Sequence, residues 1–443
     1  MDNINIPKVS VGIMNESAVD FVLNGRYSVG DTIVTGLQHA VAINGKVSWN
    51  GCLEDEISFI PVEDMQQCSF ELRDVTIGVN FHWERKENQL FRGVLKLIVE
   101  NGKVTTINIL PVEDYLMSVI SSEMSASASL ELLKAHAVIS RSWLLAQIDK
   151  NKHLEDGDKE EHSVEESGKD EMIKWYDRED HVNFDVCADD HCQRYQGITR
   201  ETTETVRKAV LETLGQVLTY DGNLCDARFS KCCGGVFELF ENCWEPKHYD
   251  YLIARRDADN ENEFPDLTKE QDAAEWIMSS PKAFCNTSDA KILSQVLNNY
   301  DQETADFYRW RVEYTQDQIS TLIKERSGID FGRIIDLRPV ARGTSGRLYK
   351  MKIVGDKKSL TIGKELEIRR ILSKSHLYSS AFIVEKHDIG ADGVPQKFVL
   401  RGAGWGHGVG LCQIGAAVMG EKGYSYKKIL LHYFANATIS KLY

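Results

Sequence analysis

The hydrophobic pattern of this chain changes its period at Pro111, and this change constrains the fold more than any other feature. Before Pro111, apolar and β-branched residues alternate with polar ones in short runs, as strands require. Asn-Gly pairs, which suit the type I′ turns of β-hairpins, separate these runs at positions 24–25, 44–45 and 101–102. After Pro111 the apolar residues follow helical spacing, with Glu113 and Asp114 in a first turn that favours acidic side chains. We therefore predict an α+β fold in which a β-rich part, residues 1–110, precedes a helical segment.

The remainder of the chain divides into a core, an inserted helical region and a C-terminal β part. The predicted core spans residues 111–260 and includes a second helix from about Leu130. Residues 261–330 are predicted to be a helical insertion, with helical runs at 272–278 and 304–312. Residues 331–443 return to short strands, then a glycine-rich block and two final helices, from about Gln413 and at 426–434. This last part is predicted to complete the core.

Residues 150–180 carry twelve acidic against six basic residues and show no apolar period. We expect a solvated or disordered insertion there. It supplies −6 of the net charge of −15 of the 443-residue chain. An acidic chain disfavours nucleic acid as the main partner, because phosphate binding needs a basic face. No stretch of the sequence approaches the ~18 apolar residues that a membrane span needs.

Glu123 is the first candidate catalytic residue. It lies between an apolar helical run and a break of small polar residues, so it falls at a helix C-terminus. The negative end of the helix dipole favours the protonated carboxyl that a general acid uses. Lys134 and Arg141 are seven residues apart on the next helix, hence on one face, and are candidates to bind an anionic substrate. The alternative is a helix-end glutamate in a surface ion pair.

The block Arg401–Ala416 has glycines at 402, 404, 406, 408 and 410. In a strand this spacing leaves one face without side chains, so that a ligand or another backbone can approach closely. Trp405 and His407 would lie on the opposite face, and Trp405 offers a flat surface for a sugar ring. The alternative is a tightly packed glycine-rich strand with a core histidine. No dinucleotide or Walker pattern fits these glycines.

Cysteines gather between residues 187 and 285, where seven of the ten occur. His181, Cys187 and Cys192 have a spacing that can bind zinc, although it is looser than that of a zinc finger. His191 is an alternative ligand, and a Cys187–Cys192 disulfide or reduced buried thiols are alternative states. Further along, Arg228–Gly235 reads as a polar turn, and its Gly-Gly end can present backbone N–H groups to a ligand.

Taken together, these segments resemble the stage II sporulation protein D family, also called the LytB amidase-enhancer family. LPVEDYLMSVISSEM and LKAHAVISR are similar to its glutamate-containing signature, and GWGHGVGLCQIGAAVMGEKGYSYKKILLHYF is similar to its C-terminal block. FSKCCGG resembles its small-residue turn, with cysteines at 232 and 233 where hydroxyls are commoner. The resemblance runs in order from about residue 6 to 443.

The resemblance implies a lytic transglycosylase that cleaves the MurNAc–GlcNAc bond of peptidoglycan to a 1,6-anhydro sugar. It implies Glu123 as the acid/base, and substrate-binding roles for Lys134, Arg141, Ser230, Lys231, Trp405, His407 and Gln413. It also implies a structural zinc at His181, Cys187 and Cys192. One carboxylate suffices, since the C6 hydroxyl of the sugar itself attacks, whereas ordinary glycosidases use two.

Two other functions compete with this one. A non-catalytic glycan-binding module would enhance a partner cell-wall amidase, and a zinc hydrolase would use the His/Cys cluster with an open metal position. The first residues contain neither a basic n-region nor an apolar h-region. Taken literally this predicts a cytoplasmic chain, whereas the resemblance implies the cell envelope.

Overall fold

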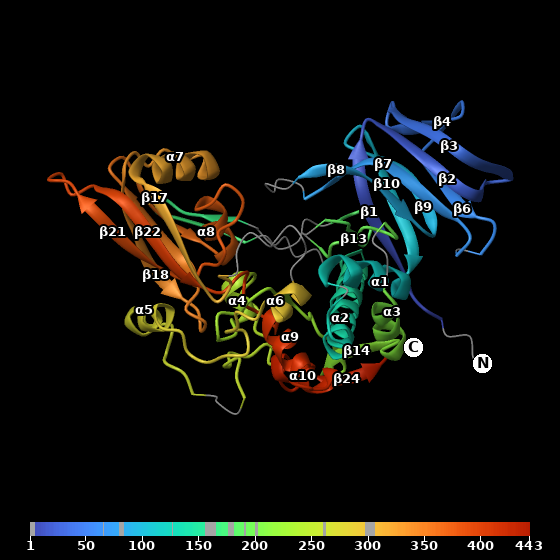
Figure 1. Ribbon diagram of the computed structural model, residues 1–443. Helices are drawn as coiled ribbons and strands as arrows, with labels where there is room; N and C mark the ends of the chain where they lie inside the picture. Colours follow the sequence, from blue (N-terminus) through green and yellow to red (C-terminus); the bar gives the residue numbers. More distant parts are fainter. Residues whose placement is uncertain are drawn as a thin grey trace. The chain divides into compact units, whose positions relative to one another are not determined.

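A computed structural model describes residues 5–64, 66–78, 84–125, 127–155, 165–175, 181–189, 192–199, 203–259, 263–296 and 306–443. Strands and helices are both abundant, which confirms the predicted α+β class (Figure 1). The chain forms two compact units. Each unit is built from several segments, and the segments of the two units alternate along the sequence. The first unit contains residues 1–157, 180–218 and 439–443, and the second contains residues 158–179 and 219–438. No helix among the described ranges is long and apolar enough to cross a membrane.

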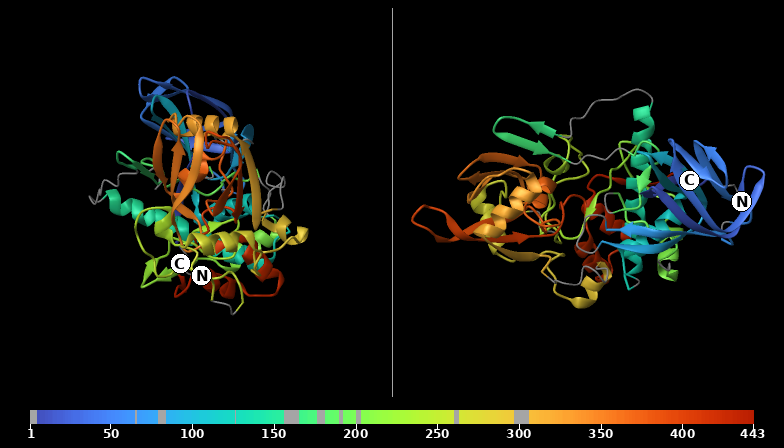
Figure 2. Two further views of the ribbon diagram at one scale, coloured as in Figure 1. Left: turned by 90° about the vertical axis from the view of Figure 1, so that its left-hand side faces the viewer. Right: turned by 90° about the horizontal axis from the view of Figure 1, so that it is seen from above.

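The first unit is built on the predicted N-terminal strands, which form one sheet with the path β13-β1-β10-β9-β6-β2-β3-β4-β5, while β7 pairs with β2 and β8. The strands are β1 (Lys8–Glu16), β2 (Ala18–Val29), β3 (Thr32–Ile43), β4 (Lys46–Trp49), β5 (Cys52–Glu54), β6 (Glu56–Pro61), β7 (Ser69–Ile77), β8 (Arg85–Phe91), β9 (Val94–Glu100), β10 (Lys103–Pro111) and β13 (Val186–Cys187). The blue and cyan strands of Figure 2 trace most of this sheet. Asn44 and Asn101 have positive φ, as the predicted Asn-Gly turns require, whereas the third predicted turn, Asn24-Gly25, lies inside strand β2.

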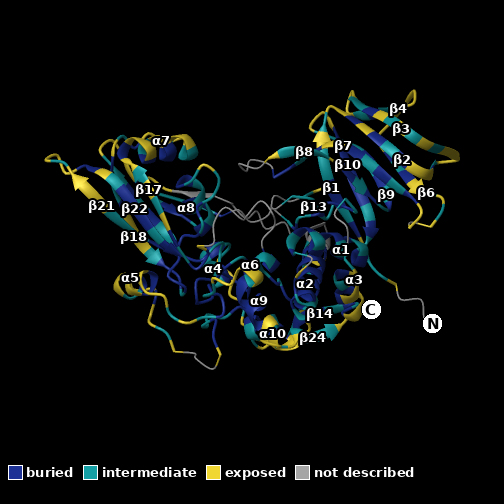
Figure 3. Ribbon diagram, in the orientation of Figure 1, coloured by how far each residue is buried: buried dark blue, intermediate teal, exposed yellow. Residues whose placement is uncertain are grey.

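Three helices belong to the first unit: α1 (Val112–Glu123), α2 (Leu130–Glu155) and α3 (Glu204–Glu212). α1 begins directly after β10, with Pro111 as its N-cap residue, so the predicted change of period lies within one residue of the observed boundary. α2 is almost entirely buried over its first four turns (Figure 3), because apolar residues occupy all of its faces there. α2 begins at the predicted Leu130.

The second unit contains two sheets around a common core. One sheet has the order β11-β12-β20-β19-β18 and the other β17-β22-β21. Their strands are β11 (Glu165–Ser167), β12 (Glu171–Lys174), β17 (Arg309–Thr315), β18 (Ile334–Arg342), β19 (Leu348–Gly355), β20 (Ser359–Gly363), β21 (Phe382–Ile389) and β22 (Pro395–Ala403). Helices α7 (Gln316–Ser327) and α8 (Glu365–Ile371) add Ile319, Ile323 and Ile368 to the core that both sheets share (Figures 1 and 2).

The remaining elements are short. They are α4 (Phe240–Cys243), α5 (Glu270–Met278), α6 (Ala290–Val296), α9 (Gln413–Glu421), α10 (Tyr426–Tyr433), the parallel pair β16 (Phe229–Ser230) and β23 (Leu411–Cys412), and the sheet β15-β14-β24, formed by Asn223–Leu224, Gln216–Tyr220 and Thr438–Lys441. The predicted helices at 272–278, from Gln413 and at 426–434 correspond to α5, α9 and α10.

Two predicted segments differ from the structure. The run 304–312 was predicted to be helical, but Arg309–Thr315 is strand β17, paired with β22. Its period is two, because Trp310, Val312 and Tyr314 pack on the core while charged residues alternate with them. The acidic insertion is not structureless over 165–175, because β12 pairs parallel with β20 and buries Ile173. Residues 150–155 of the predicted insertion are also not disordered, because they form the end of α2, and residues 156–164 and 176–180 lie outside the described residues.

Candidate functional site

Glu123 is the last residue of α1, as predicted. The helix buries Val112, Leu116 and Ile120. Met124 is its C-cap residue, and the N–H of Met124 donates to the carbonyl of Ile120. The half-buried carboxylate of Glu123 accepts a hydrogen bond from the backbone N–H of Arg194 at 3.3 Å. No ion pair within the described part of the chain involves Glu123. The carboxyl group is therefore held by a neutral donor, the backbone N–H of Arg194.

The segment 192–197 follows α1 and supplies this donor. Tyr195 stacks on Tyr115 of α1 with ring centroids 5.1 Å apart. The N–H of Gln196 donates to the hydroxyl of Ser118 at 3.3 Å, one turn and a half before Glu123. The two residues that follow Arg194 are thus both anchored to α1, which helps to fix the position of Arg194.

The structure brings the three predicted metal ligands together. One nitrogen of His181 and the sulfurs of Cys187 and Cys192 all lie within 4.8 Å of one another, and His181 Nε2 is 3.5 Å from Cys192 Sγ. β13 places Cys187 beside Gly12 of β1, and Gly12 leaves room for the ring of Phe184, which stacks on His181. One imidazole and two thiolates are ligands that zinc prefers, so the donor set fits zinc. His191, the alternative ligand, lies outside the described residues.

Arg141 was predicted to contact the glycan, but it lies in the interior of the first unit. Its guanidinium is completely buried and binds both carboxylate oxygens of Glu113, at 2.9 and 2.7 Å, as well as the carbonyl of Gln216 at 2.9 Å. A buried and fully paired guanidinium cannot contact a glycan strand, so the predicted glycan role of Arg141 is replaced by a structural one. Lys134 lies 3.2 Å from Glu131 and 2.6 Å from Glu212, and joins α2 to α3. Its glycan role stays a prediction.

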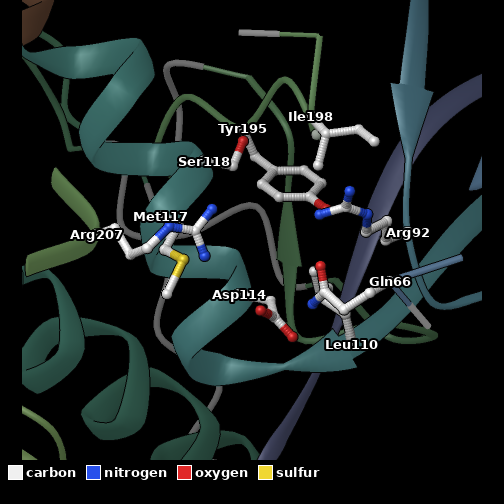
Figure 4. Close-up of a pocket in the computed structure, with 10 residues that line it drawn as sticks. Gln66, Arg92, Leu110, Asp114, Met117, Ser118, Tyr195, Ile198 and Arg207 are labelled. Atoms are coloured by element: carbon white, nitrogen blue, oxygen red, sulfur yellow. The ribbon is translucent and has the colours of Figure 1, made fainter. Parts of the chain in front are cut away.

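A pocket lies beside α1 (Figure 4). Asp114, Met117 and Ser118 line it from the helix, and Arg92, Tyr195 and Arg207 line it from neighbouring segments. Burial raises the pKa of Asp114, while the positive charges of Arg92 and Arg207 act in the opposite direction. The pocket therefore presents a carboxyl group between two guanidinium groups. Sequence reasoning missed it, because its residues come from separate strands and loops.

The glycine-rich segment of the second unit is not the predicted strand. β22 ends at Ala403, and Gly404, Gly406, Gly408 and Gly410 all have φ between 70° and 87°. L-residues avoid this region, so the glycines serve a repeatedly turning backbone and not a bare strand face. Gly408 also leaves space for Arg347, since a Cβ there would lie 2.5 Å from the guanidinium carbon.

Trp405 and His407 project from this segment into aromatic surroundings. Trp405 contacts Phe307 and Tyr378 with ring centroids 4.9 and 4.7 Å away. His407 lies against Trp244 at 4.8 Å, and its Nδ1 accepts the N–H of Val409 at 3.0 Å. Burial lowers the pKa of His407 well below its ordinary value, and the nearby Arg228 and Arg347 add to this. The imidazole is therefore neutral at pH 7 and acts as an acceptor at Nδ1.

Three other predicted substrate ligands lie close to this segment. Ser230 of β16 accepts the N–H of Gly408 through its hydroxyl at 3.2 Å, and β16 pairs with β23. Lys231 Nζ donates to the carbonyl of Val296 at 2.6 Å, and Gln413 is buried at the start of α9. The structure thus gathers Ser230, Trp405, His407 and Gln413 in the second unit. That the fold brings them to Glu123, which belongs to the first unit, stays a prediction.

Arg347 holds the glycine-rich segment in place and was missed from the sequence. It is buried and donates to the carbonyls of Gly406, Cys233 and Cys232 at 3.0, 2.9 and 3.3 Å. No sequence pattern marked it, because its partners are backbone carbonyls of distant segments.

Comparison with known proteins agrees with this arrangement of two units. Residues 100–220 match the family model described as "Stage II sporulation protein", and residues 238–410 match a domain of unknown function, DUF8618. The first match contains α1, Glu123 and the His/Cys cluster. This part of the chain, well under half of its length, is similar to the stage II sporulation protein family.

Individual relatives are distant. The chain is 25% identical over 342 residues to the amidase enhancer of Bacillus subtilis (strain 168), which covers 73% of this chain and 40% of that protein. It is 21% identical over 334 residues to the stage II sporulation protein D of the same organism, covering 75% of each. An uncharacterized protein of Brachyspira hyodysenteriae is 25% identical over 349 residues, 79% of this chain and 72% of that protein. The chain thus spans less than half of the amidase enhancer.

Proposed function

We propose that this protein acts on the bacterial cell wall as a peptidoglycan lytic transglycosylase with Glu123 as its general acid and base. The observation that carries the proposal is the state of Glu123: a half-buried carboxylate at a helix end, held by a backbone N–H and free of ion pairs within the described residues. The similarity to the stage II sporulation proteins supports the cell wall as the place of action, which implies the cell envelope as the working compartment.

In the proposed reaction, the protonated Glu123 donates its proton to the glycosidic oxygen between MurNAc and GlcNAc. The bond from that oxygen to C1 of MurNAc breaks, and GlcNAc leaves. The C6 hydroxyl of the same MurNAc attacks C1 and gives its proton to the Glu123 carboxylate. The product is 1,6-anhydro-MurNAc, and Glu123 returns to its starting state. No water is activated, so a second carboxylate is not needed.

His181, Cys187 and Cys192 are the residues that would hold a zinc ion. Bound there, the ion would supply a structural cross-link of the loop 181–192. Arg194 follows that loop by two residues and donates to Glu123. The loop would thereby hold the donor that orients the catalytic carboxylate.

A second function is favoured by one specific observation. The relative that matches 342 residues of this chain is named an amidase enhancer. In this alternative the protein binds glycan strands without cutting them and stimulates a partner amidase. Glu123 would then contribute to binding or to structure only.

Mass spectrometry of purified glycan strands separates the two functions. Strands incubated with the wild-type protein should release fragments ending in 1,6-anhydro-MurNAc, and Glu123→Gln should release none while it keeps the wild-type thermal transition. Glu131→Gln, on the neighbouring helix, is the matched control and should behave as the wild type. Equal product from wild type and Glu123→Gln would refute the catalytic role. No product from either, together with faster cleavage by an added amidase, would support the enhancer.

A further inference from the structure

Four buried side chains of the second unit converge at a point that the proposed reaction does not use. They are Cys233, Asp257, Cys285 and Cys412, and one ligand atom of each lies within 4.8 Å of all the others. Cys233 Sγ is 3.5 Å from Cys285 Sγ and 3.6 Å from Asp257 Oδ2. The four come from a turn, two loops and the end of β23, so the fold and not local sequence brings them together.

The separations suit a tetrahedral metal site. With Zn–S bonds of about 2.3 Å and Zn–O bonds of about 2.0 Å, two ligand atoms of a tetrahedron are roughly 3.5–3.8 Å apart. The Cys233 contacts fall at or near this range. The sulfur atoms are much farther apart than the ~2.05 Å of a disulfide, and all ten cysteines are free.

The surroundings fix the side chains as a metal site requires. The hydroxyl of Tyr433 donates to Asp257 Oδ1 at 2.9 Å, and the N–H of Cys285 donates to Asp257 Oδ2 at 3.0 Å. Gly415 leaves the necessary space, since a Cβ there would lie 2.4 Å from the Tyr433 hydroxyl. Partners of this kind orient the ligands in known metal sites.

The charge of the site also calls for a cation. Asp257 is completely buried, and the ionisable basic group that the described residues place near it is His432, with its Nε2 at 3.5 Å from Oδ1. Within the described parts of the chain, that nitrogen has no hydrogen-bond partner. A buried carboxylate beside three sulfurs is costly unless a positive charge is present, and a divalent ion bound by thiolates supplies it.

We propose that Cys233, Asp257, Cys285 and Cys412 bind a structural zinc ion, separate from the site at His181. With four protein ligands and no exposed edge, the site is of the closed kind that stabilises a fold. It joins the end of the glycine-rich segment at Cys412 to the turn at Cys233 and to the loops around Asp257 and Cys285. Together with the zinc proposed at His181, Cys187 and Cys192 in the first unit, the protein would then hold two zinc ions.

Metal analysis of the full-length protein tests the proposal without any activity measurement. The protein is purified with a reductant and without chelator, and zinc is measured by mass spectrometry of the elements. The variant Cys187→Ser/Cys192→Ser, which removes the first site, should retain about one zinc per chain. Adding Cys285→Ser or Asp257→Asn should reduce this to nearly none. Cys225→Ser, equally buried but outside the cluster, is the control and should retain the ion.

Cobalt replacement gives a second measurement. Cobalt in the Cys187→Ser/Cys192→Ser protein should show thiolate charge-transfer absorption that Cys285→Ser weakens and Cys225→Ser leaves unchanged. Should the double variant fail to fold, the wild type is compared with Asp257→Asn, which should lose one zinc of two. Absence of metal from the double variant, an unchanged metal content after Cys285→Ser, or a Cys233–Cys285 disulfide found by peptide mapping would overturn the proposal.

Discussion

Arg141 and Glu113 form a two-fold hydrogen-bonded ion pair that is sealed inside the first unit. The guanidinium and the carboxylate share two contacts, at 2.9 and 2.7 Å, and the hydroxyl of Tyr443 adds a third contact to Glu113 at 2.6 Å. The pair joins the first turn of α1 to the middle of α2. It therefore fixes the two helices that carry Glu123 and Lys134.

Removal of one member of this pair should destabilise the protein strongly. Glu113→Ala leaves a buried guanidinium without its counter-charge, which costs about 3–5 kcal/mol. Lys134→Ala removes surface ion pairs and should cost at most ~1 kcal/mol. Chemical denaturation of the three proteins measures the difference. Similar losses for both variants would contradict the structural role assigned to Arg141.

Loss of the first metal site should reduce activity through the position of Arg194. Cys187→Ser or a strong chelator should lower the rate of anhydro-product release about 10–100-fold, the usual cost of losing a supporting contact at a metal site. The thermal transition should fall together with the rate, because the loop itself loosens. A zinc hydrolase would instead lose its activity before any change in folding. Following product release and circular dichroism during chelation tells the two apart.

Stability should decline in acid because of His376. Burial lowers the pKa of this imidazole from 6.5 to about 4, and Arg369 and Arg326 add to the shift. The unfolded chain therefore binds the proton first as the pH falls. The contribution of His376 is complete above pH 6.5 and is lost between pH 6.5 and about 4, with a slope of at most ~1.4 kcal/mol per pH unit.

Denaturation at several pH values in this window tests the assignment. His376→Gln should flatten the pH dependence of stability, whereas the exposed His387→Gln should leave it unchanged. An equal slope in all three proteins would assign the acid sensitivity to other groups.

Gly408 should not tolerate a side chain. Its φ is +78°, and a Cβ would overlap the Arg347 guanidinium at 2.5 Å. Gly423 has a similar φ of +81° but open space around it. Both alanine variants have a backbone strain of about 1–2 kcal/mol, and Gly408→Ala should lose at least ~1 kcal/mol more from overpacking. Thermal melting of the Gly408→Ala and Gly423→Ala variants isolates the steric part of the loss in stability. Equal losses in the two variants would show that Arg347 does not pack tightly against Gly408.

Turn residues, hydrophobic period and residue spacing correctly predicted those elements whose structure depends mainly on neighbouring residues in the sequence. The turn residues and the period change at Pro111 predicted β10, α1 and the position of Glu123 at the helix end, and the spacing of His181 and the two cysteines predicted their convergence. The helical prediction for Thr304–Val312 was wrong because its three charged residues and the apolar residues between them also fit a helix. Only the pairing of β17 with β22 decides the strand.

Contacts between distant segments could not be predicted in this way. Arg141 reads as a surface cation until Glu113 is placed against it. The glycines at 404–410 read as a strand face, because their positive φ values follow from the turns around Arg347. Asp257 and Cys285 carry no spacing signal toward Cys412, which lies more than 120 residues further along the chain. In each of these cases the residue contacts a segment that is distant in the sequence, so its role could be seen only in the folded structure.

The interleaving of the two units has a consequence for synthesis on the ribosome. Glu113 and Arg141 emerge early, but Tyr443 is made 330 residues after Glu113. Strand β12 likewise waits for β20, almost two hundred residues later. The first unit therefore reaches its final packing only after Tyr443 has been made, and the second only after β20 has been made. A fragment cut to residues 100–220 would be missing partners that native folding supplies last.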